Sequence, residues 1–398
     1  MVNMIRPSGS HEWFPCNGSQ VMQEGKPNDD SDSTREGTAC HWVAEQVASA
    51  YITPNKSLTT SADFVGQLAP NDVLIDEEMY QSAIDYVTDI MKYCNQSGLM
   101  RSVQLEQKLN LDEIYPGMSG TPDVYIWNSD DLELVLWDLK YGYGHVEVYE
   151  NPQLMIYIAG ILKRHNLEGQ ILTMITVRMR IFQPRSFHGE GPMREWAIKA
   201  VDLLPYFIKL KHAASITMSG QGQCVPGNHC RHCRGRIDCS ALIKTNYNSI
   251  DVINGPVPMN MTGNNLALEL QLLNRMTKLL KFRQSAVEKQ VEYEIENGAV
   301  LPGFIRTETY GRVRWKKGTP TDEVLMMADL MGVNLRKPDN LDTPTQAKVK
   351  FKNKAKELGV SLDDTAKLVL QYSETPYNGM KVTEDDGSKL RQAFTKEI

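Results

Sequence analysis

Two aspartates and a lysine occur at a spacing that could hold a divalent metal ion. Asp123 leads into an apolar segment typical of a strand, and Asp138, Leu139 and Lys140 end the next apolar segment. Because side chains alternate along a strand, Asp138 and Lys140 point to one face while Leu139 points to the other. If the two strands pair, all three polar side chains come together.

Such a cluster has a definite chemistry. Two carboxylates at one point are costly unless a cation neutralises them, and oxygen ligands suit Mg²⁺ or Mn²⁺. An ion of this kind polarises a phosphodiester and lowers the pKa of a bound water, and Lys140 would orient that water or stabilise the developing charge. The same three residues also fit an ordinary strand end that carries charges as protection against aggregation.

Further polar residues lie where they could complete the site. His41 lies near the start of an expected helix, where an imidazole could reach a metal, and Gln153 and Tyr157 fall four apart on one face of another. Each also has an ordinary explanation, His41 as a surface or capping group and the Gln/Tyr pair as packing.

The elements that must position these residues follow from hydrophobic periodicity. Helices are expected over 36–51, 76–94 and 152–163, and strands over 103–109, 124–127, 133–139 and 172–182. The order is that of a small mixed α/β (α+β) sandwich. The whole chain has 398 residues, 41% of them hydrophobic, which suffices for one large core and an appended domain.

A change of composition marks a second domain. Asn, Pro, Gly and Met without periodicity fill 240–265, so we expect one domain over 1–245 and a smaller, mainly helical module over 260–398. A long amphipathic helix is expected over 266–296, followed by a hairpin with basic and aromatic residues suited to DNA. The candidate DNA contacts are Arg185, Arg312, Arg314, Lys316 and Lys317. Charged runs are equally often a solvated surface.

The net charge of −6 neither supports nor excludes a DNA substrate, because an enzyme can confine its basic groups to one groove. No segment has the roughly 20 apolar residues that a bilayer requires, and no secretory signal is evident. We therefore expect a cytoplasmic protein with no membrane partner.

Three of the seven cysteines have the spacing of metal ligands. Cys230, Cys233 and Cys239 lie in a short polar loop, and four thiolates bind either Zn²⁺ or an iron–sulfur cluster. Cys224 could complete a local zinc site, whereas Cys16 would join the start of the chain to the end of the first domain. Cys40 and Cys94 are expected to be buried, inert thiols.

The ordered set of His41, Gly120-Thr-Pro-Asp123, Asp138-Leu-Lys140 and Gln153-x₃-Tyr157 resembles the RecB-type branch of the PD-(D/E)XK nucleases. This resemblance implies a restriction-endonuclease-like core with a mixed central sheet flanked by helices. It implies that His41, Asp123 and Asp138 hold Mg²⁺ or Mn²⁺ and that Lys140 assists the attacking water. Gln153 and Tyr157 would help to position the substrate. Glu106 resembles an acidic residue sometimes found on the preceding strand.

One cysteine before the nuclease motifs and three after them resemble the iron–sulfur nucleases of CRISPR adaptation and the AddB subunit of end-resection enzymes. The resemblance implies a structural [4Fe–4S] cluster on Cys16, Cys230, Cys233 and Cys239, with Cys224 as a spare thiol. The alternative is Zn²⁺ at Cys224, Cys230, Cys233 and Cys239.

Several smaller features resemble an uncharacterised phage and prophage family of RecB-like proteins. They are Ser8-Gly-Ser-His-Glu-Trp13, Gln183-Pro-Arg185 and Pro226-Gly-Asn-His-Cys-Arg231. The expected function is a Mg²⁺- or Mn²⁺-dependent deoxyribonuclease, in particular an exonuclease, of phage recombination, replication or DNA degradation in the bacterial host cell. An annealing or recombination protein would be its partner. The alternatives are a catalytically idle nuclease fold that binds DNA ends or a recombination partner, and a zinc-stabilised structural protein.

Overall fold

The computed structural model describes residues 4–27, 32–53, 59–98, 102–186, 191–253, 264–311, 313–316 and 319–336, and short segments between 343 and 384. The chain forms two compact units, Met1–Gln284 and Ser285–Ile398, which we describe separately.

A five-stranded sheet in the order β1-β4-β5-β6-β7 is the centre of the first unit. Its strands are β1 (Val103–Leu105), β4 (Val124–Asn128), β5 (Glu133–Leu139), β6 (Thr176–Phe182) and β7 (Met193–Lys199). β5 and β6 pair in parallel and the other neighbours pair antiparallel. The parallel pair is joined by the crossover helix α5 (Pro152–Arg164). The predicted mixed α+β class, with a mixed sheet flanked by helices, is confirmed.

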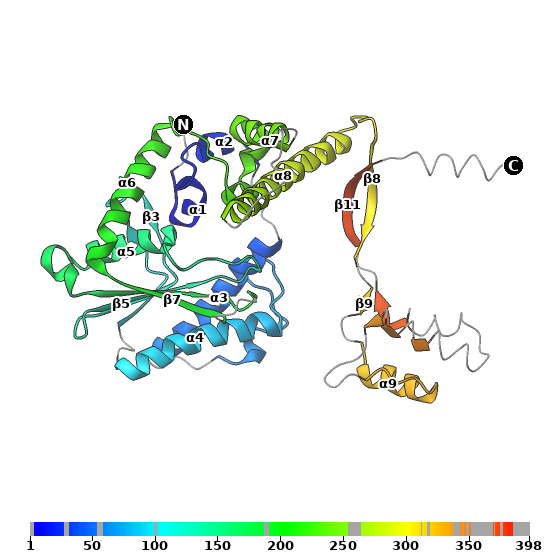
Figure 1. Ribbon diagram of the computed structural model, residues 1–398. Coiled ribbons are helices and arrows are strands. Elements are labelled where there is room, and N and C mark those ends of the chain that lie inside the picture. The colour runs from blue at the N-terminus through cyan, green and yellow to red at the C-terminus, as the bar shows by residue number, and fades with distance from the viewer. Residues whose placement is uncertain are drawn as a thin grey trace. The chain divides into compact units, whose positions relative to one another are not determined.

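Helices cover both faces of the sheet (Figure 1). Leu134 and Leu136 of β5 belong to a core shared with α5 and α6 (Leu204–Ser219), together with the short α1 (Ser10–Trp13). The alternate residues, including Trp137 and Leu139, belong to a core shared with α3 (Asp32–Ile52) and α4 (Glu77–Ser97). Burial of both faces explains why β5 is apolar almost throughout its length.

Local sequence signals fix the ends of two of these helices. The side chain of Asp76 accepts the Met79 N–H at the start of α4, which ends at Gly98 with φ +68°. Asn151 caps α5 by accepting the N–H groups of Gln153 and Leu154, and Pro152 occupies the first helical position. No helix among the described residues is both long and apolar enough to cross a bilayer.

Two predicted strands are shorter than expected. The strand predicted over 103–109 is interrupted at Glu106, whose φ of +44° is incompatible with a continuous strand. It gives β1 and then β2 (Leu109–Asn110), which pairs with β3 (Ser119–Gly120). The start of the predicted 172–182 strand is instead the 3₁₀ helix η4 (Gly169–Thr173). Strand β7 and helix α6 were not predicted.

The first and last segments of this unit are built from short helices. The first are η1 (Pro7–Gly9), α1 and α2 (Ser19–Gln23), and the last are η6 (Asn228–Arg231), η7 (Arg234–Ile237) and α7 (Ser240–Ile253). The remaining 3₁₀ turns are η2 (Ser61–Asp63) and η5 (Ala200–Leu203). Helix α7 occupies part of the segment predicted to be a linker.

The long helix predicted over 266–296 is present as α8 (Asn264–Glu296). The first unit extends along it to Gln284, well beyond the predicted boundary at 245–260. Leu279 and Phe282 of α8 pack against the cysteine-rich loop, which accounts for the later division.

Among its described residues, the second unit contains the end of α8, the helix α9 (Thr321–Leu330) and two small antiparallel strand pairs. β8 (Phe304–Tyr310) pairs with β11 (Tyr377–Glu384), and β9 (Arg314–Trp315) pairs with β10 (Ser373–Glu374). The predicted hairpin after α8 is therefore wrong, because β8 and β9 each pair with a strand far along the chain and not with each other.

Two helix glycines give a stability test of this packing. A Cβ on Gly160 of α5 would lie 2.4 Å from Cδ2 of the buried Leu111, whereas a Cβ on Gly37 of α3 would meet nothing within 4 Å. Alanine favours a helix over glycine by up to about 1 kcal/mol, but overpacking costs about 1–3 kcal/mol. We expect Gly160→Ala to lower the unfolding temperature and Gly37→Ala to leave it unchanged or raise it. Equal effects in thermal unfolding would contradict the close packing of α5 against Leu111.

Candidate metal centre

Asp123 connects three parts of the first unit at one point. Its Oδ2 accepts the backbone N–H of Leu139 at 2.7 Å, and its Oδ1 lies 3.3 Å from Nδ1 of His41 on α3. Its backbone carbonyl accepts the Glu106 N–H at 2.9 Å. The end of β5, helix α3 and the turn after β1 therefore all contact this residue.

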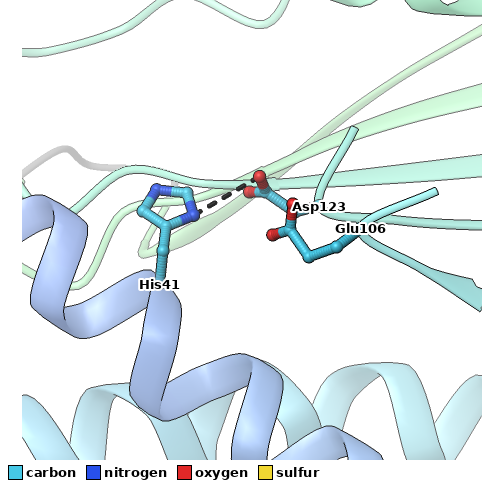
Figure 2. A group of neighbouring side chains, drawn as sticks. All are labelled: His41, Glu106 and Asp123. Carbon is cyan, nitrogen blue, oxygen red and sulfur yellow. Dashed lines mark ion pairs between the residues drawn. The ribbon is translucent and has the colours of Figure 1, made fainter. Parts of the chain in front are cut away.

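Glu106 completes a group of three possible metal ligands with His41 and Asp123 (Figure 2). One ligand atom from each residue lies within 4.8 Å of the others. The positive φ of Glu106 is rarely adopted by a side-chain-bearing residue, and such strain concentrates at functional sites. The sequence suggested Glu106 only through its resemblance, because a backbone angle of this kind leaves no pattern in the composition.

Asp138 and Lys140 lie beside this group in a second set of contacts. Asp138 is 2% exposed, and its Oδ2 lies 2.7 Å from Nζ of Lys140. Gln153 of α5 bridges the pair: its Nε2 donates to Asp138 Oδ1 at 3.0 Å and its Oε1 accepts from Lys140 Nζ at 3.3 Å. Asp138 is thus held by Lys140 and Gln153 and is not a member of the group formed by His41, Glu106 and Asp123.

Tyr157 lies one helical turn after Gln153, in contact with its side chain. It is 5% exposed and faces Gly120, where an added Cβ would come within 2.9 Å of the Tyr157 ring. The structure thus brings the predicted Gln/Tyr pair to the site. In this position Tyr157 contacts Gln153 and is shielded from solvent.

Burial and mutual charge shift the pKa values of these groups. Burial alone would lower the pKa of His41 and raise that of Asp123, but the attraction between the two outweighs it and reverses both directions. Burial outweighs the pull of Lys140 and raises the pKa of Asp138. Burial would lower the pKa of Lys140, but Asp138 raises it, so Lys140 is a cation. Burial, followed by the charge of Asp123, raises the pKa of Glu106 to about 7.

A pocket of about 420 Å³ opens over the group. Its walls come from the first turns of α3 on one side and from the end of β5 on the other. The residues around it are Thr34, Gly37, Thr38, His41, Glu106, Asp123, Leu139, Lys140 and Tyr141. The ligand group and the lysine therefore share one solvent-accessible space.

These residues fit a divalent cation. A carboxyl group whose pKa rises to about 7 beside a second carboxylate is an arrangement that a bound cation would relieve. Asp138 Oδ2 is buried and accepts no well-aligned hydrogen bond, although it is paired with Lys140. Imidazole and carboxylate ligands together suit Mn²⁺ as well as Mg²⁺.

Arg185 is engaged within the protein. Its Nη1 lies 2.6 Å from Glu36 of α3 and its Nε 2.8 Å from Glu78 of α4, and its side chain is 9% exposed. A guanidinium bound in this way holds the two helices together and has little surface left for DNA.

The other predicted DNA contacts belong to the second unit. Arg314 pairs with Glu374 at 2.9 Å, and Lys316 donates to the carbonyl of Gln371 at 2.8 Å. Arg312 and Lys317 lie outside the described residues. The described cations of this segment thus have partners within their own unit.

Five cysteines converge on a second, small cavity. Cys16 lies beside Cys224, Cys230, Cys233 and Cys239, although 209 residues separate it from Val225, whose N–H points at its sulfur at 3.4 Å. The N–H of Gly227 points at the sulfur of Cys230 in the same way. Cys40 and Cys94 are buried in the core between the sheet and α3 and α4, and burial raises the pKa of Cys40 to about 12.

The cavity fits a thiolate-bound metal group. Four of its cysteines are buried and Cys224 is half-buried, and burial raises the pKa of Cys16, Cys224, Cys230 and Cys233, a cost that a bound metal removes. Backbone N–H groups directed at sulfur are a common feature of iron–sulfur sites. Tetrahedral Zn²⁺ with Zn–S bonds of about 2.3 Å would gather its sulfurs within about 4 Å. Among the described residues, the sulfurs form no three-membered group within 4.8 Å.

The comparison with protein families places nearly all of the chain in one group. Residues 3–371 match the model of a family described as a protein of unknown function, DUF2800. This match includes the three candidate metal ligands, the Asp138–Lys140 pair and all the cysteines. The chain therefore belongs to the DUF2800 family.

Proposed function

We propose that this protein is a Mg²⁺- or Mn²⁺-dependent deoxyribonuclease that acts on DNA ends. The observation that carries the proposal is the group of His41, Glu106 and Asp123, which shares one open pocket with the ammonium group of Lys140. Metal-assisted phosphodiester hydrolysis uses carboxylate ligands that hold the cation and a nearby positive charge such as that of lysine. The resemblance of the ordered motifs to RecB-like nucleases adds DNA as the substrate and digestion from an end as its mode of action.

Each residue has a role that follows from its contacts. His41, Asp123 and Glu106 would hold the cation, with Asp138 beside them. When bound, the cation polarises the phosphodiester and acidifies the attacking water. Lys140, whose charge is maintained by Asp138, faces the pocket and stabilises negative charge on the phosphate. Gln153 holds Asp138 and Lys140 in register and acts as a positioning residue.

We further propose that Cys16, Cys230, Cys233 and Cys239 hold a structural [4Fe–4S] cluster. The convergence of Cys16 with the late cysteines supports this assignment, as do the N–H groups directed at Cys16 and Cys230. The cluster would bind the N-terminal helices to the loop that precedes α7. A zinc ion on Cys224, Cys230, Cys233 and Cys239 is the alternative, and the side-chain contacts of Cys224 with Cys16 and Cys239 keep it in view.

A phage recombination or annealing protein remains the proposed partner, on the resemblance alone. The cytoplasm of a bacterial host cell remains the proposed compartment. A catalytically idle DNA-binding fold is the competing function. The intact ligand group and the lysine that shares its pocket argue against it.

Cleavage should depend on the two carboxylates and the lysine. We expect Asp123→Asn, Asp138→Asn and Lys140→Met each to slow digestion of end-labelled linear DNA in Mn²⁺ by at least about 100-fold. Asp123→Asn removes a proposed cation ligand, Asp138→Asn removes the carboxylate that holds Lys140, and Lys140→Met removes the positive charge at the reacting phosphate. Asp202→Asn, which changes an exposed carboxylate, is the matched control and should retain full activity. Equal digestion by the wild type and the three site variants would refute the proposal.

Metal binding should depend on Glu106. In isothermal titration with Mn²⁺ and no DNA, we expect Glu106→Gln to weaken binding by about tenfold or more, because a neutral amide replaces a carboxylate ligand. The wild type should also unfold at a higher temperature with Mn²⁺ than with EDTA. Glu168→Gln, an exposed control, should bind like the wild type. Unchanged affinity in Glu106→Gln would remove Glu106 from the ligand set.

The two cysteine assignments make opposite predictions. With an iron–sulfur cluster, the anaerobically purified protein should be brown, contain iron and absorb at about 400 nm. Cys16→Ser should abolish that absorption and Cys224→Ser should preserve it. A colourless protein that contains zinc, and that loses the zinc in Cys224→Ser but not in Cys16→Ser, would establish the alternative.

A further inference from the structure

One aromatic side chain next to the metal pocket is exposed but firmly held. Tyr143 lies in the loop that follows Lys140, and 64% of its surface is exposed. Large aromatic rings usually contribute their area to a core or an interface. An exposed ring that is fixed in place, and that lies near a site, therefore calls for a partner.

A buried glutamine fixes the backbone on both sides of this ring. Gln183 is fully buried, and its Nε2 donates to the carbonyls of Gly142 and Gly144, both at 2.7 Å. Its Oε1 accepts the N–H of Val146 at 3.1 Å and Nη2 of Arg194 at 2.8 Å. The two residues that flank Tyr143 are thus attached to the end of β6.

Arg185 connects the ring to the metal pocket. Its Cζ lies 5.0 Å from the centre of the Tyr143 ring and 3.8 Å from that of Tyr141, which lines the pocket. Glu36 and Glu78 hold the guanidinium in place. One face of Tyr143 therefore rests on an immobilised cation, and the ring loses little further freedom when a ligand stacks on it.

We propose that Tyr143 stacks against an unpaired nucleobase of the DNA strand that enters the metal pocket. This inference rests on the proposed nuclease function and names its substrate as a single-stranded or frayed end, since a base within a duplex has no free face. Stacking on an aromatic ring tolerates any base, so the contact would guide the strand without selecting a sequence. Arg185, which we place as a support for this ring, would contribute to DNA binding indirectly.

The loop itself supplies a matched control. Tyr149 is the same residue type, 57% exposed, but its ring lies 5.1 Å from Trp196 of β7 and is not stacked on Arg185. We expect Tyr143→Ala to weaken binding of a fluorescently labelled single strand by about tenfold, with Ca²⁺ replacing the catalytic cation, because base stacking is worth about 1–3 kcal/mol. Tyr143→Phe and Tyr149→Ala should bind within twofold of the wild type.

A scan with abasic nucleotides distinguishes stacking from a loss of loop structure. Removing one base at a time should weaken wild-type binding most strongly at one position near the strand end. Tyr143→Ala should lose the penalty at that position. If Tyr143→Ala fails to fold, the scan with the wild type and Tyr143→Phe still decides, because both should show the same single position.

Three outcomes would overturn the inference: wild-type affinity in Tyr143→Ala, an equal loss in Tyr149→Ala, or no position-specific penalty in the wild type. The proposed nuclease function can fail separately. Digestion of DNA that does not depend on Tyr143 would contradict only the stacking contact. Stacking-dependent binding without digestion would contradict only the nuclease.

Discussion

The carboxylate of Asp123 is the interaction on which the rest of the site depends. It accepts a backbone N–H from the end of β5 and holds the imidazole of His41 on α3. It thereby fixes the distance between a helix on one face of the sheet and the polar groups at the strand end. A half-buried ion pair of this kind stabilises a fold little when compared with apolar packing. Its value in the proposed metal site is that it places the candidate ligands in advance of the cation.

Much of this site could be predicted because strand and helix periodicities are local. The alternation of β5 places Asp138 towards α5 and Leu139 in the opposite core, and α5 begins at its capping signal. Given those two elements, the contact between Gln153 and the Asp138–Lys140 pair follows from one strand and one helix that are adjacent in sequence. Contacts between elements that are adjacent in sequence depend on few residues, so they can be predicted without knowledge of the rest of the fold.

The remaining features depend on contacts between distant segments. Glu106 lies beside His41 and Asp123 because its backbone has a left-handed φ angle, which no residue pattern predicts. Arg185 was predicted to contact DNA, but its partners Glu36 and Glu78 lie 149 and 107 residues away. The predicted hairpin was wrong for the same reason. Tyr310 pairs with Tyr377, and such a distant pairing is determined by tertiary packing and not by local propensity.

The convergence of Cys16 with the late cysteines has a consequence for the order of folding. A ribosome delivers the N-terminal helices first, whereas the residues that surround Cys16 follow more than two hundred residues later. A nascent chain that ends at α6 already has the sheet and the candidate metal ligands, but the other cysteines of the cavity have yet to be made. Trp13 can already pack against α5 and α6 at that stage, so the helical segment is in place before its cysteine meets the others. Closing so long a loop is entropically slow, and the contact between Cys16 and the late cysteines therefore forms last.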